Sequence, residues 1–240
     1  MAGGRTIDKR GHDAIHGIMK SAQRQGTTIW GIALALLLMA TTLWWVFGPG
    51  PIGEARRDRA DKSAYARWTA RPPAAARPAL EAYLRAEGVA GLVPMEQLLR
   101  SDVRWRKCKG QPFTVPPRAL WPHIVPTLRV LRDDVIPAIG AVRVVSSYRS
   151  AADNPCLGGA KASRHLGFAA LDMEPVAPLS RIELVRRLCA LHARHGSAKA
   201  IGLGIYHARR FHIDTDGYRR WGHDYHTATS PCLAAVHKIR

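Results

Sequence analysis

The chain has 240 residues, of which 47% are hydrophobic and 22% are charged. This composition is typical of a globular protein and excludes a disordered or fibrous chain. Lysine and arginine number 36 against 18 aspartate and glutamate, so the formal net charge is +18. A positive charge of that size indicates an anionic partner, and nucleic acid, a membrane surface and an acidic polymer all qualify.

Residues 27–47 form an uncharged apolar segment, TTIWGIALALLLMATTLWWVF. At about 1.5 Å per helical residue, the segment is long enough to cross the roughly 30 Å hydrocarbon core of a bilayer. Trp30, Trp44 and Trp45 lie near its ends, where aromatic belts form. We therefore expect a transmembrane helix over 27–47.

A buried core helix and a cleaved signal peptide are the rival interpretations of this segment. The segment is not amphipathic, its leader is long, and no small-x-small cleavage pattern follows Phe47, so an uncleaved anchor is favoured. Basic residues flank both ends and do not decide the orientation. The short leader and the long cysteine-containing remainder favour a cytoplasmic segment 1–26 and an exported C-terminal domain.

The segment that follows is predicted to be a stalk over 48–77, because Gly48-Pro49-Gly50-Pro51 stops a helix and an Ala/Pro/Arg run comes later. From residue 78 to 240 the pattern is that of a domain. Apolar spacings of three and four predict short helices at 79–88 and 94–101 and a longer helix, entered through prolines, within 116–140.

The second half of this domain contains the predicted strands. Residues 141–148 and 168–174 are rich in small and β-branched side chains, and 198–207 and 209–221 read as a hairpin that closes near Ala208-Arg209. Between them, 180–195 is an amphipathic helix with Ile182, Val185, Leu188 and Leu191 on one face. Helices first and a mainly antiparallel sheet second predict an α+β domain.

The four cysteines, Cys108, Cys156, Cys189 and Cys232, contain no C-x-x-C pair, which argues against a zinc cluster built from them. An even number beyond the apolar segment indicates disulfides in an oxidising compartment, with three pairings possible. The alternative is four free thiols in a cytosolic domain.

Candidate metal ligands gather in two places of the C-terminal half. SRHLGFAALD places His165 seven residues before Asp172, and FHIDTDG places His212 on a predicted strand. Two imidazoles and one carboxylate, with a fourth position open for water, are the ligand set of a catalytic zinc site. Asp214 projects to the same side of the strand as His212, because strand side chains alternate.

These motifs resemble the zinc D-alanyl-D-alanine carboxypeptidase family, whose relatives include D,D-dipeptidases, phage endolysin peptidases and the hedgehog signalling domain. The family pattern Ser-x-His-x-x-Gly-x-Ala-x-Asp is matched at Ser163, His165, Ala170 and Asp172. VVSSYRSAADN resembles the family's Ser-x-Tyr-Arg-Ser segment, and GLGIYHARRFHIDTDGYRRW resembles its closing strand pair. The resemblance covers about residues 115–222.

The resemblance implies zinc bound by His165, Asp172 and His212, with Arg149 holding a carboxylate or carbonyl of the substrate. It also implies hydrolysis of stem peptides or crosslinks of bacterial peptidoglycan. Ser163 and Tyr148 are expected to form walls of the site. Such a protein would lie in the inner membrane by a single span, with its C-terminal domain in the periplasm or outside the cell.

Two positions depart from the family pattern. The family glycine falls at Phe168, with Gly167 one place early, so we expect a rebuilt turn there. The acid that many members carry three residues before the last His is Arg209, which cannot act as a base at neutral pH. Asp214 is then the best candidate for the general base, ahead of Asp216 and His207, and its alternative role is to orient His212.

The missing acid also supports a rival interpretation, a non-catalytic zinc-containing module that binds peptidoglycan or a protein. No aromatic residues are interleaved with the basic ones and no nucleic-acid motif is matched, so we expect no nucleic-acid partner. The expected partners are peptidoglycan stem peptides and the membrane.

Overall fold

The computed structural model describes residues 30–43 and 51–233. The chain divides into two compact units, Met1–Asp61 and Lys62–Arg240. Residues 30–43 of the first unit are helical, and their large apolar side chains, such as Trp30 and Leu37, are exposed. Both ends of the predicted span 27–47 lie outside the described residues. Among the helices that are described, none is both long and apolar enough to cross a membrane.

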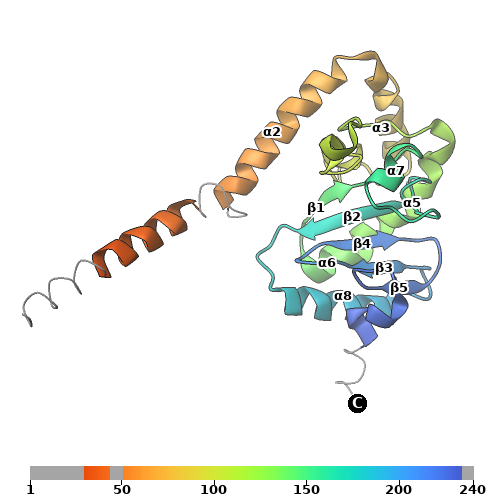
Figure 1. Ribbon diagram of the computed structural model, residues 1–240. Helices are drawn as coiled ribbons and strands as arrows, with labels where there is room; N and C mark the ends of the chain where they lie inside the picture. The colour runs from red at the N-terminus through yellow and green to blue at the C-terminus, as the bar shows by residue number, and fades with distance from the viewer. Residues whose placement is uncertain (1–29, 44–50, 234–240) are drawn as a thin grey trace, which may run out of the picture. The chain divides into compact units, whose positions relative to one another are not determined.

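The second unit begins within the helix α2, Pro51–Thr69, and mixes helices with one sheet (Figure 1). Its helical elements are η1 (Pro72–Ala74), α3 (Arg77–Ala86), α4 (Met95–Leu98), η2 (Trp105–Cys108), η3 (Arg118–Leu120), α5 (Trp121–Val130), η4 (Leu131–Val135), α6 (Ile136–Ile139), α7 (Asp153–Cys156), α8 (Arg181–His195) and η5 (Thr227–Thr229). The strands are β1 (Val142–Ser146), β2 (Ala170–Pro175), β3 (Gly202–Ile205), β4 (Phe211–Asp214) and β5 (Arg219–Trp221).

The strands form one five-stranded sheet in the order β1-β2-β4-β3-β5. Three neighbouring pairs are antiparallel, and β3 pairs with β5 in parallel. The α+β class is therefore confirmed, with a mixed sheet. The predicted hairpin is β3 and β4, whose turn includes Ala208 at a positive φ of 54°.

Alternation along the two central strands separates an apolar face from a polar face. Leu171 and Met173 on β2 and Phe211 and Ile213 on β4 are fully buried in the hydrophobic core. The helices that complete this core include α5, which contacts β2, and α8, which contacts α6 and η4 (Figure 1). The intervening residues, among them Asp172 and His212, lie on the other face.

Helix α8 begins as the sequence predicts, because Ser180 caps it by accepting a hydrogen bond from the backbone N–H of Glu183. Its buried face was predicted only in part. Ile182 is 82% exposed, whereas Leu184, Leu188 and Leu191 are buried. The reason is geometric, since Ile182 precedes Leu184 by two residues, or about 200° around a helix.

The predicted stalk contributes to the folded unit. Trp68 is buried, and its ring and that of Tyr65 pack on Phe113 at centroid distances of 5.7 and 5.3 Å. The compact unit accordingly begins at Lys62, before the predicted domain boundary at residue 78. Two aromatic side chains near the end of α2 supply the apolar area that fixes this segment.

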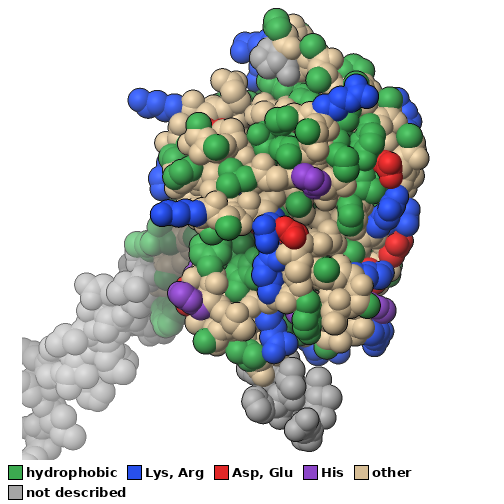
Figure 2. Space-filling view, turned by 90° about the vertical axis from the view of Figure 1, so that its right-hand side faces the viewer, with side chains coloured by type: hydrophobic (Ala, Val, Ile, Leu, Met, Phe, Trp, Pro, Cys, Tyr) green, Lys and Arg blue, Asp and Glu red, His purple; other side chains and the backbone are tan. Residues whose placement is uncertain are grey.

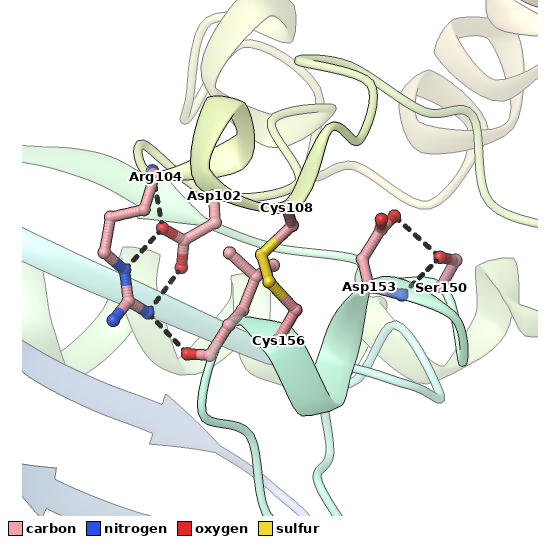
Figure 3. The surroundings of a disulfide bond; sticks show 7 residues. Asp102, Arg104, Cys108, Ser150, Asp153 and Cys156 are labelled. Atoms are coloured by element: carbon pink, nitrogen blue, oxygen red, sulfur yellow. Dashed lines mark hydrogen bonds and ion pairs between the residues drawn. A yellow bond between two sulfur atoms is a disulfide. The ribbon is translucent and has the colours of Figure 1, made fainter.

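The cysteines form two disulfides, as the sequence predicts, and the structure selects one of the three pairings. Cys108 of η2 is bonded to Cys156 of α7, and Cys189 of α8 is bonded to Cys232 near the end of the described chain. The first bridge joins the segment before β1 to the loop that leads to His165 (Figure 3).

Candidate metal centre

The turn that carries His165 into β2 keeps the conformation that a glycine would favour. Phe168 has a φ of +53° and is fully buried, and the ring of Tyr148 meets it edge-on at 6.4 Å. Gly167 has no positive φ. Burial of the phenylalanine ring offsets the roughly 1 kcal/mol cost of the left-handed backbone, so Phe168 can stand where the family pattern has a glycine.

His165, Asp172 and His212 come together on the polar face of the sheet. Asp172 of β2 is directly opposite His212 of β4 in the antiparallel register. Asp172 Oδ1 lies 3.2 Å from His165 Nε2 and 2.9 Å from His212 Nδ1. All three side chains are buried, and one potential ligand atom from each lies within 4.8 Å of the others.

His165 presents a free lone pair to this group. Its Nδ1 lies 2.6 Å from the Ser147 carbonyl oxygen, so Nδ1 carries the proton and donates it there. Burial lowers the pKa of His165, which keeps the ring neutral at pH 7. Nε2 is buried and has no hydrogen-bond partner within the described structure. An orphaned, unprotonated nitrogen beside a carboxylate is what a metal ion would satisfy.

His212 is held from behind by Asp214. His212 Nε2 donates a hydrogen bond to Asp214 Oδ2 at 2.9 Å, which leaves Nδ1 facing Asp172. Burial opposes the charged form of His212, but the carboxylates of Asp172 and Asp214 outweigh it and raise the pKa of the imidazole. This carboxylate–histidine pairing is the usual support of a metal-binding imidazole.

Asp214 is fully buried and also receives the Asp216 backbone N–H at 3.0 Å and Arg219 Nη2 at 2.8 Å. It is not among the residues that line the cavity over His165, Asp172 and His212. These contacts match the orienting role that the sequence left open for Asp214, rather than that of a base facing the cavity.

Two glycines of β3 make room for side chains of neighbouring strands. A Cβ at Gly202 would lie 2.5 Å from Asp214 Oδ2, and one at Gly204 would lie 2.5 Å from Trp221 Nε1. The Trp221 ring packs beside His212 at a centroid distance of 5.1 Å. Sequence analysis missed these three residues, although Gly-x-Gly within a strand is itself a signal of close approach by a neighbour.

Arg149 is engaged with buried carboxylates. Its Nη2 lies 2.7 Å from Asp172 Oδ2 and 3.3 Å from Asp102 Oδ2, and its Nε donates to Ser146 Oγ at 2.9 Å. Only 4% of Arg149 is exposed, and Asp102 is fully buried. Arg149 therefore lines the cavity as an ion-pair partner of Asp172, one of the three candidate metal ligands.

Asp102, which sequence analysis missed, is fixed from the other side by Arg104 (Figure 3). Arg104 Nε lies 2.9 Å from Asp102 Oδ1, and Arg104 Nη2 also donates to the Leu157 carbonyl at 2.8 Å. Leu157 directly follows Cys156 of the first disulfide. A chain of contacts thus runs from the disulfide through Asp102 and Arg149 to Asp172.

His165, Asp172 and His212 line a cavity of about 530 Å³. Ser163 lines it as expected, and so does His207, whose ring lies 4.5 Å from that of His223. Tyr148 is not one of its lining residues, because its ring packs on Phe168.

Arg209, at the position of the missing acid, donates to the Ala177 carbonyl. Asp216 is exposed and pairs with Arg164 at 2.8 Å.

The comparisons with known proteins agree with this geometry. Residues 103–214 match the family model described as Peptidase M15. The resemblance to the zinc D-Ala-D-Ala carboxypeptidases is thereby confirmed over that segment, which contains His165, Asp172 and His212. No curated protein and no solved structure gives a match. Peptidases of the M15 family are zinc-dependent, and the orphaned His165 Nε2 beside Asp172 and His212 fits that ion.

Substitution of Gly202 by alanine should weaken zinc binding without touching a ligand. The new Cβ would displace the Asp214 carboxylate from His212, and loss of such outer support typically costs 10- to 100-fold in metal affinity. Gly167→Ala is the matched control, because its Cβ would meet no atom closer than 3.8 Å. Zinc affinity is measured by competition with a chelator, and equal affinities in the two variants would refute the role given to Asp214.

Removal of either disulfide should lower the stability by a similar amount, but only one of the two removals should lower zinc affinity. Each bridge closes a loop of 48 or 43 residues, so Cys→Ser replacement of both partners should cost about 4 kcal/mol in either case. Only the Cys108–Cys156 bridge leads to Asp102 and Arg149. We expect zinc affinity to fall in that variant and not in the Cys189/Cys232 variant; denaturant unfolding and zinc titration of both variants check this.

Proposed function

We propose that this chain is a zinc metallopeptidase that hydrolyses peptide bonds of bacterial peptidoglycan, as a D,D-carboxypeptidase or endopeptidase. The observation that carries the proposal is the group of His165, Asp172 and His212 at the wall of an open cavity, within the segment that matches Peptidase M15. Zinc, when bound, lowers the pKa of a water and polarises a carbonyl.

The residues of this chain prepare the site for that chemistry. The Ser147 carbonyl and the Asp214 carboxylate fix the orientations of the His165 and His212 rings, so that one nitrogen of each ring faces Asp172. Arg149 neutralises the outer oxygen of Asp172 and keeps the inner oxygen toward the imidazoles. Pre-orientation of the three ligands removes reorganisation when the reaction begins.

The charge of the domain supports an acidic, wall-borne substrate. On the face drawn in Figure 2, more Lys and Arg than Asp and Glu is visible. Arginines line the cavity itself, where only Asp172 and Glu174 are acidic. A cationic cavity attracts peptides that carry free carboxylates, as stem peptides do.

We further propose that residues 27–47 anchor the chain in the inner membrane and that the folded unit lies in the periplasm or outside the cell. The uncharged sequence of the segment and the exposed apolar side chains of residues 30–43 support the anchor. The two disulfides support an oxidising compartment. Retention in the membrane fraction after an alkaline wash tests the anchor, and release of the full chain by that wash contradicts it.

A non-catalytic binding module on the same fold is the second candidate. It is favoured by Arg209 at the position of the family's acid and by the burial of Asp214 away from the cavity. Mass spectrometry of muropeptides incubated with the zinc-loaded full chain separates the two. Shortened stems or opened crosslinks support the peptidase, and binding without any new product supports the module.

A further inference from the structure

The arginines of the cavity differ in how fully their charges are neutralised. Arg104, Arg149 and Arg219 each form an ion pair of 2.7 to 2.9 Å with a buried carboxylate, that of Asp102, Asp172 or Asp214. Such pairs are costly to break, because each carboxylate would be left buried without its partner. These three guanidinium groups hold the site together and are not available to a ligand.

The other cavity arginines are Arg164, Arg220 and Arg210. Arg164 pairs closely with Asp216, at 2.8 Å, and Arg220 of β5 lines the cavity with no acidic side chain paired to it in the described part of the chain. Arg210 forms only a loose contact: its Nη2 lies 3.5 Å from Glu174 Oε1, and the two side chains are 25% and 35% exposed. A pair this long and this exposed contributes little to stability and opens at low cost.

Arg210 and Glu174 are also well placed to meet a substrate. Arg210 precedes His212 by two residues on the β4 side, and Glu174 follows Asp172 by two residues on β2. Residues two apart on a strand share a face and lie about 7 Å apart along it. Arg210 and Glu174 therefore line the same cavity as the candidate metal ligands, two residues further along each strand.

We propose that Arg210 and Glu174 form a subsite for an amino-acid end that carries both a free carboxylate and a free ammonium group. The guanidinium binds the carboxylate and the Glu174 carboxylate binds the ammonium, so the ligand replaces one loose ion pair by two closer ones. This inference rests on the proposed function, because the amino acid that a carboxypeptidase releases carries both groups, and it moves recognition of the terminal carboxylate from Arg149 to Arg210.

The test measures binding of three small probes to the zinc-loaded full chain by calorimetry: D-alanine, N-acetyl-D-alanine and D-alaninamide. Arg210→Gln should weaken D-alanine and N-acetyl-D-alanine by about 10- to 100-fold and leave D-alaninamide unchanged, since a hydrogen bond between charged groups is lost. Glu174→Gln should weaken D-alanine and D-alaninamide and spare N-acetyl-D-alanine. Arg210→Lys should retain part of the carboxylate affinity.

Arg164→Gln is the matched control, because Arg164 lines the same cavity and is already paired with an exposed carboxylate. Equal affinity of the Arg210→Gln variant and the unmodified chain for D-alanine would overturn the inference, as would an equal loss in Arg164→Gln. None of the probes contains a peptide bond between two amino acids, so probe binding is measured independently of hydrolysis. If the chain does not hydrolyse muropeptides, the probe affinities still test the subsite; if the probes do not bind, the peptidase proposal is unaffected.

Discussion

Replacement of His165 by alanine should abolish zinc binding and peptide hydrolysis together. The variant removes a buried imidazole nitrogen that has no hydrogen-bond partner in the described residues, and it leaves Asp172 and His212 as a two-ligand group. Loss of outer support alone costs 10- to 100-fold in metal affinity, so loss of a ligand should exceed about 100-fold. Metal analysis after dialysis and a muropeptide assay of the same sample measure both effects.

His195→Ala is the control for this experiment, because its side chain is 41% exposed and its Nδ1 only approaches Asp134, at 3.9 Å. The control should bind zinc and turn over substrate as the unmodified chain does. Retention of stoichiometric zinc by the His165 variant would show that the metal lies elsewhere.

Replacement of Asp102 by asparagine should lower both stability and zinc affinity. The change leaves Arg149, a guanidinium that is 4% exposed, with one carboxylate in place of two, and breaking a buried ion pair in this way costs about 3 to 5 kcal/mol. Arg149 then loses the contact that positions it on Asp172, so zinc affinity should fall by about 10-fold or more. Denaturant unfolding and chelator competition give the two numbers.

Asp133→Asn is the surface counterpart, because Asp133 pairs with Arg132 in water, with each side chain 44% exposed. We expect no measurable change in its stability or zinc affinity. If Asp102→Asn changed stability and zinc affinity as little as Asp133→Asn, the contacts from Asp102 through Arg149 to Asp172 would contribute to neither property.

The sequence predicts those parts of the fold that depend on local pattern. Composition and hairpin spacing identified β2 and β4, and alternation placed His212 and Asp214 on one side of their strand. The amphipathic pattern of 180–195 marked α8, and the motifs around His165, Asp172 and His212 marked the candidate metal ligands. Each of these features is encoded within a few neighbouring residues.

Contacts between distant segments could not be predicted in this way. Asp102 meets Arg149 only because the segment before η2 runs beside β1, where the Val103 N–H donates to the Val145 carbonyl. Trp221 lies beside His212 only because β5 pairs in parallel with β3. At Phe168, the pattern indicated a missing glycine, but burial of the ring decided the backbone conformation.

The most direct test of the account is a zinc titration of the metal-free full chain, with muropeptide hydrolysis recorded after each addition. Activity should be absent without zinc, rise linearly and reach its plateau at about one zinc per chain, because His165, Asp172 and His212 form the one group of this kind in the described residues. Full hydrolysis by the metal-free chain, or no hydrolysis at any zinc concentration, would contradict it.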